Sequence, residues 1–174
     1  MDDSMQKYAG SSDREQAVFR VEVATQNTED DIEARNALHE LREYGLSQLT
    51  SARSSRIYAI RGNLTYLDID RIAGELLTDP VLEMFSVNQT VFPELGSLEH
   101  MIEIARRSGV MEPSETSALK VTAALGLKVD QIRLGWRYIF NGPVSKSVLY
   151  TAVLRILANP VIEKVAIDSE LNLM

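Results

Sequence analysis

Residues 77–83 read LTDPVLE, and residues 157–163 read LANPVIE. The two stretches lie 80 positions apart and share leucine, proline, valine and glutamate at matching places. Working outward, further matches follow in the same order at offsets of 80 or 81; among them are Tyr44-Gly45-Leu46 with Leu125-Gly126-Leu127 and Val21-Glu22-Val23 with Ile102-Glu103-Ile104. Because the matches are colinear, the sequence predicts a tandem duplication, with a period too long for a solenoid.

The repeat predicts four segments along the chain. Residues 1–16 are polar and are expected to form a flexible N-terminal tail. The first unit spans residues 17–88, and the second spans residues 98–174. Residues 89–97, QTVFPELGS, contain proline and glycine and are expected to form a linker.

Each unit has the same expected order of elements. An alternating run predicts a strand, a helical stretch follows, and a longer β-rich stretch comes next. That stretch is interrupted at Ser54-Ser55 and at Leu134-Gly135, which predicts a hairpin in each unit. A second helix and a last strand complete the order β-α-β-β-α-β. The predicted fold class is α+β, with two tandem ferredoxin-like units and antiparallel sheets.

Capping residues mark the expected helix ends. Thr28, with Asp31 three residues later, predicts one helix start, and Pro113 fits the first turn of another. Gly45 and Gly126 are typical left-handed helix stops. The Asp79-Pro80 and Asn159-Pro160 pairs end the second helix of each unit, because a residue before proline avoids the α region.

The strand patterns also predict how the units pair. Glu22 and Glu103 lie in mid-strand and are expected to face solvent. Apolar residues are expected on the sheet face away from the helices; these are Tyr58, Ile60, Tyr138 and Phe140. A unit of this size with such a face exposed is marginally stable. We therefore expect the two units to form an intrachain pseudo-dimer, and two chains to form a homodimer.

Composition excludes several function classes. The 174 residues carry a net charge of −7, which disfavours nucleic-acid and acidic-membrane partners. The chain has no cysteine, so disulfides, thiolate metal sites and thiol catalysis are excluded, and a cytoplasmic location is expected. The only histidines, His39 and His100, lie far apart in the sequence. No phosphate-binding loop or nucleophile motif occurs, so no catalytic residue, metal or cofactor is expected.

Three stretches of the second unit resemble a known family. They are GVMEPSETSALKVTAALGL (109–127), VDQIRLGWRYIF (129–140) and ILANPVIEKV (156–165). Together they resemble PurS, the small subunit of phosphoribosylformylglycinamidine (FGAM) synthase. The first unit resembles a diverged PurS unit, which keeps Asp79-Pro80-Val81 and Glu83.

The family motifs map onto candidate subunit contacts. The helix start corresponds to Glu112 and Pro113. The family's V-R-x-G-K turn, in which x is any residue, corresponds to Arg133 and Gly135. Trp136 stands where the family has lysine, and Arg137 follows it. The last motif corresponds to a run that includes Asn159 and Pro160. Trp136 and Arg137 are also candidate contacts because tryptophan and arginine are enriched at interface hot spots.

The resemblance implies a role in purine biosynthesis. FGAM synthase is an ATP-dependent ligase that uses glutamine as its nitrogen donor. A PurL-like synthetase holds ATP and substrate, and a PurQ-like glutaminase releases ammonia. PurS has no catalytic residues and bridges the two, so that ammonia passes between them. The chain is expected to bridge the two proteins in the same way, either as a separate subunit or as the N-terminal part of a longer synthetase.

Two other readings stay open at this stage. A tandem ACT-like module binds amino acids at domain interfaces and shares the expected element order; it calls for a glycine-containing loop after the first strand. Residues 24–30 lack glycine, and residues 105–112 contain only Gly109. A small enzyme on a ferredoxin-like scaffold is the other reading, and the lack of paired histidines or clustered acids disfavours it.

Overall fold

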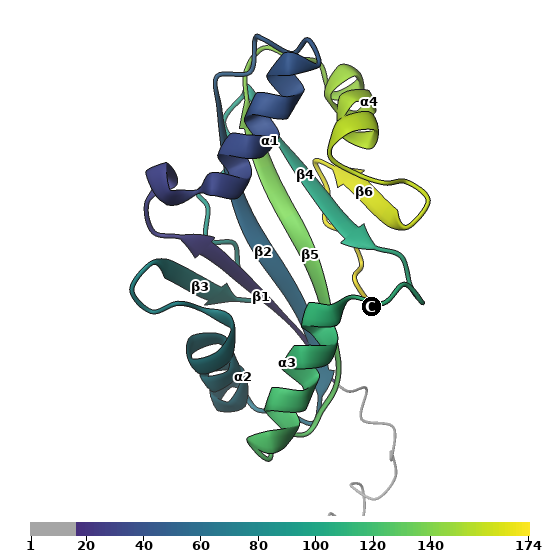
Figure 1. Cartoon of the computed structure of the whole chain (residues 1–174). Helices are drawn as coiled ribbons and strands as arrows, with labels where there is room; N and C mark the ends of the chain where they lie inside the picture. Colours follow the sequence, from purple (N-terminus) through teal and green to yellow (C-terminus); the bar gives the residue numbers. More distant parts are fainter. Residues whose placement is uncertain (1–16) are drawn as a thin grey trace, which may run out of the picture.

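The computed structural model describes residues 17–174, so the expected tail at 1–16 lies outside the described residues. Its fold class is α+β, with one six-stranded antiparallel sheet and four α-helices in the described part (Figure 1). In chain order the elements are β1 (Val18–Thr25), α1 (Ile32–Glu43), β2 (Ser51–Gly62), α2 (Tyr66–Ile72), β3 (Glu83–Val87), β4 (Glu99–Arg106), α3 (Pro113–Ala124), β5 (Val129–Asn141), α4 (Lys146–Ile156) and β6 (Glu163–Ile167), with a short 3-10 helix at Thr28–Asp30 and a π-helical turn at Ala73–Leu77.

The strand order is β3-β1-β2-β5-β4-β6, so the two halves join at their long strands, β2 and β5. The pairing register repeats between halves. Val21 pairs with Tyr58 in the first half, and their counterparts at offsets 81 and 80, Ile102 and Tyr138, pair in the second. Across the junction Arg56 pairs with its own counterpart, Trp136, which places a pseudo-two-fold axis at this pair. The sequence repeat is therefore matched by a repeat in topology and register.

The expected hairpins are wrong. Residues 51–62 and 129–141 each form one continuous strand, so each half has the order β-α-β-α-β. Ser54 and Ser55 are buried because their hydroxyls donate hydrogen bonds to carboxylates. Gly135 is needed for close packing, because a Cβ there would lie 3.3 Å from the carbonyl oxygen of Ile104. These residues satisfy buried contacts and do not form turns.

All four helices pack on one face of the sheet, and the halves exchange their first helices. Leu41 of α1 packs in a core with α4 and the second half's strands. Ala118 of α3 packs in a core with α2 and the first half's strands. In Figure 1, α1 accordingly lies beside α4, and α3 beside α2. Each core therefore needs residues from both halves.

The expected outward position of four apolar residues is wrong. They lie on the helix-covered face, where they are at most 7% exposed: Tyr58, Ile60, Tyr138 and Phe140. Long strands buried at one end do not alternate cleanly, because the second face is also partly covered. The period-two pattern alone therefore did not distinguish the faces.

Helix starts follow local capping chemistry. Asp31, rather than the expected Thr28, caps α1 by accepting the Ala34 N–H at 2.9 Å. The carboxylate of Asp31 also accepts the Ser54 N–H and hydroxyl, at 2.6 and 2.7 Å, so the cap anchors α1 to β2. Pro113 opens α3 as expected. None of the helices described is long and apolar enough to cross a lipid bilayer.

Separating the halves within residues 89–97 should unfold both. The first core loses Ala118 and Ile132, and the second loses Leu41, Leu46 and Leu49, all of which are less than 9% exposed. We expect neither fragment alone to show a near-UV circular dichroism signal or a cooperative thermal transition, and an equimolar mixture to recover both. A fragment 98–174 that melts alone at the temperature of the intact chain would contradict the exchange.

Candidate functional site

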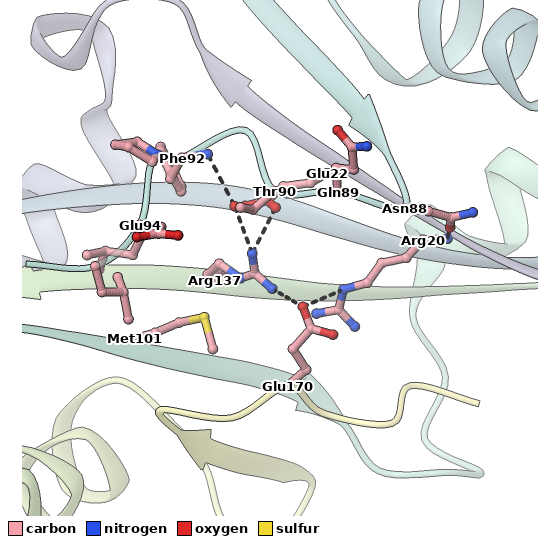
Figure 2. Close-up of a pocket in the computed structure, with 13 residues that line it drawn as sticks. Arg20, Glu22, Asn88, Gln89, Thr90, Phe92, Glu94, Met101, Arg137 and Glu170 are labelled. Carbon is pink, nitrogen blue, oxygen red and sulfur yellow. Dashed lines mark hydrogen bonds and ion pairs between the residues drawn. The ribbon is translucent and has the colours of Figure 1, made fainter.

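A cluster of buried charges lies on the sheet face that carries no helices. Glu22 of β1, Glu103 of β4 and Arg137 of β5 are 1%, 1% and 3% exposed. Glu22 and Glu103 are counterparts in the repeat, and both were expected to face solvent. That expectation is wrong, because the chain segments that follow β3 and β6 cover this face of the sheet (Figure 2).

Arg137 forms ion pairs with both glutamates. Its Nη1 lies 2.8 Å from Oε2 of Glu22, and its Nη2 lies 2.7 Å from Oε1 of Glu103. The Ser55 hydroxyl donates to the other oxygen of Glu22 at 2.6 Å. Burial works against the guanidinium charge, but the carboxylates outweigh it and raise the pKa of Arg137 above its usual value. A fully bonded arrangement of this kind is required for buried charges to persist.

The two covering segments meet at the same guanidinium. The Thr90 hydroxyl, in the segment after β3, accepts from Arg137 at 3.1 Å. Glu170, the counterpart of Thr90 after β6, lies 2.8 Å from Arg137. The backbone N–H of Leu171 donates to Glu103 at 2.7 Å, and Arg20 donates to the same carboxylate. Figure 2 shows Arg20 and Arg137 converging on Glu170.

A cavity of about 570 Å³ lies between the sheet and the first covering segment. Residues from Asn88 to Leu95 form one wall, and Met101 and Ile139 add apolar surface. Four charged groups of its lining, Arg20, Glu22, Arg137 and Glu170, are paired with one another, so the arrangement acts chemically as a clamp that holds the two segments on the sheet. Glu22, Glu103 and Glu170 converge on Arg137, and residues 17–174 contain no group of histidines and acids arranged to hold a metal ion.

A second site lies at the end of the sheet where α3 begins. Glu112 caps α3 and accepts a hydrogen bond from Nε of Arg106 at 2.5 Å. Burial would raise the pKa of Glu112, but the bonds from Arg106 and from the Ser114 N–H outweigh it and hold the pKa below its usual value. Glu112 is therefore held as an anion beside Arg106.

The motif residues of the second half meet around the Arg106–Arg107 backbone. Arg133 donates to the Arg106 carbonyl at 2.9 Å and lies 3.5 Å from Glu115. Nη2 of Arg107 donates to the Pro160 carbonyl at 3.0 Å, and the Arg107 N–H donates to the Ile162 carbonyl at 2.8 Å. We call the surface formed by Arg107, Met111, Arg133, Pro160, Val161 and Lys164 the basic corner.

The structure separates the eight candidate residues. It groups five of them around this backbone: Glu112, Pro113, Arg133, Asn159 and Pro160. The expected turn at Gly135 and Trp136 is wrong, because both lie inside β5. Trp136 stacks on Tyr138 with ring centroids 6.2 Å apart, and Arg137 belongs to the buried cluster.

Several residues of these sites were not among the candidates, including Arg20 and Glu170, which belong to the buried cluster, and Lys164, which belongs to the basic corner. One signal was available for the buried cluster: Glu22 and Glu103 recur at matching positions within otherwise apolar runs. Buried carboxylates require a cation. Which arginine supplies it depends on the junction between β2 and β5, which the local pattern does not reveal.

Comparison with known proteins adds no family. No protein-family model matches the chain, and the curated proteins include no significant match to it.

Replacing Arg137 with methionine should destabilise the fold by about 3–5 kcal/mol at neutral pH, because one buried partner is removed. Glu103 keeps Arg20, whereas Glu22 keeps only the Ser55 hydroxyl. Carboxylates as a class are charged at neutral pH and protonated in acid, so the penalty should be largest at neutral pH and shrink as the pH falls.

Urea denaturation at several pH values measures this effect. Adding Glu22→Gln to the variant should recover part of the stability at neutral pH. The matched control is Arg35→Met, because Arg35 is exposed and donates only to the Glu29 carbonyl. An Arg137→Met loss no larger than the Arg35→Met loss, or one independent of pH, would contradict the buried cluster.

Proposed function

We propose that the chain is a PurS-like component of FGAM synthase that bridges the synthetase and the glutaminase so that ammonia passes between them. One observation carries the proposal. Residues from each of the three stretches that resemble PurS, Glu112, Arg133 and Pro160, meet around the Arg106–Arg107 backbone and form one surface. A shared surface is what a docking role requires of separate motifs.

The buried cluster supports a structural role for the rest of the chain. Its cations and anions are paired with one another, so they serve to fix the covering segments. The halves share their cores and form one body, which presents its two ends in a fixed relation. A rigid body with two related ends suits a bridge between two larger proteins. We propose that the repeat is a fused pair of PurS-like units.

Reconstitution with the synthetase and glutaminase of the same organism tests the proposal. Glutamine-dependent FGAM formation should require the chain, because ammonia released in solution is protonated and diluted. FGAM formation from added ammonium salts should not require it, because the synthetase then receives ammonia without transfer. We expect at least a tenfold difference between the two nitrogen sources in their dependence on the chain.

Two controls accompany this assay. The purified chain alone should turn over neither ATP nor glutamine. Free amino acids should not shift its melting temperature, whereas a saturable shift would favour an ACT-like regulatory module. Equal glutamine-dependent rates with and without the chain would overturn the proposed bridging role.

A further inference from the structure

Two cations at the basic corner have no acidic partner in the described part of the chain. No carboxylate oxygen lies within 4.0 Å of Arg107 or of Lys164, counting residues 17–174. Both are instead tied to carbonyl oxygens, Arg107 to that of Pro160 and Lys164 to that of Asn172. The Arg107 backbone bonds Ile162, two residues before Lys164, which holds the two side chains at the same corner.

These cations repel one another. Burial lowers the pKa of Lys164, and the charges of Arg133 and Arg107 lower it further. Like charges held together destabilise the free protein, and an anion placed between them removes that cost. Glu115 pairs with Arg133 and Glu112 pairs with Arg106, but no described carboxylate lies within 4.0 Å of Arg107 or Lys164, so these two cations lack an acidic partner.

The fold does not require these charges, as the first half shows. Gln26 is the counterpart of Arg107, and its N–H donates to the Leu82 carbonyl at 2.9 Å, the same backbone contact. Its side chain donates to the Glu83 carbonyl at 3.1 Å. Met84 is the counterpart of Lys164. Neutral residues therefore build the same corner in the first half.

Exposed apolar side chains flank the cations. Val161, next to Pro160, is 80% exposed, and Met111, on the loop that follows Arg107, is 78% exposed. A free phosphate ion satisfies the charges but leaves this apolar surface in water. A protein surface that carries a carboxylate beside apolar side chains satisfies both.

We propose that the basic corner docks a carboxylate-bearing surface of a protein partner, with Arg107 and Lys164 receiving the carboxylate and Val161 and Met111 covered by apolar contacts. The identity of the partner rests on the proposed function, which names the synthetase and the glutaminase. The charge complementarity itself rests on the described contacts alone.

The test measures the affinity of the chain for each purified component by isothermal titration calorimetry. The double variant Arg107→Gln and Lys164→Met gives the second half the residues of the first. We expect it to bind at least about tenfold more weakly and with a flatter dependence on salt. Its melting temperature should equal or exceed that of the natural chain, because the repulsion is removed.

Matched controls separate docking from general charge and surface effects. Arg35→Gln removes an exposed arginine that also donates only to a backbone carbonyl, and it should leave the affinity unchanged. Val161→Ser should weaken binding, whereas Val81→Ser at the counterpart position, 77% exposed, should not.

Each outcome decides between the two proposals. Binding by the natural chain and equal binding by the double variant would overturn the docking site and leave the bridging role intact. If the natural chain binds neither component, both proposals fail. Displacement of a bound component by inorganic phosphate at ordinary salt would show that the corner holds a free anion, which also overturns the docking site.

Discussion

Arg137 carries a full charge into a position where the residue is only 3% exposed, and the helix-free face is arranged around this constraint. Burial of an unpaired charge costs several kcal/mol, which is a large part of the stability of a small protein. Two glutamates on different strands and a third after β6 remove that cost. The strands β1, β4 and β5 and both covering segments are thereby tied to one group.

The duplication explains why acids from both halves contact the same arginine. Glu22 and Glu103 are counterparts, and so are Thr90 and Glu170, and all four contact Arg137. The counterpart of Arg137 is Ile57, which is 1% exposed and packs with Leu173. Arg137 lies one residue from the pseudo-two-fold axis, and near this axis the glutamates of the two halves come close enough to contact the same side chain. A second arginine at residue 57 would compete for those acids and leave a buried charge unpaired.

Features that depend on local sequence pattern, such as the repeat and the start of α3, were predicted correctly. Features that depend on which strand pairs with which, such as strand continuity and the buried face, were not. Colinear matches at offsets of 80 and 81 predicted the repeat, and Pro113 predicted a helix start that the structure contains at the beginning of α3. The serines at 54 and 55 resemble turn residues only while their partners, Asp31 and Glu22, are unknown. Tyr58 and Tyr138 were assigned to the wrong face because both faces of the long strands are covered. The convergence of motif residues around Arg106 and Arg107 depends on the pairing of β4 with β6, which no single stretch specifies.

Two halves with the same register allow structural and functional demands to be separated. Where counterparts keep the same chemistry, as in the buried glutamates at 22 and 103, the shared fold is a sufficient reason for the chemistry. Where counterparts make the same backbone contact but differ in side-chain chemistry, the shared fold does not explain the difference. Gln26 and Arg107 make the same backbone contact, yet only the arginine adds a charge that repels Lys164. A residue that costs stability in a position where a neutral side chain suffices indicates a demand from outside the chain. By this comparison the proposed docking residues belong to the second half, and the first half supplies a helix to the core of that half.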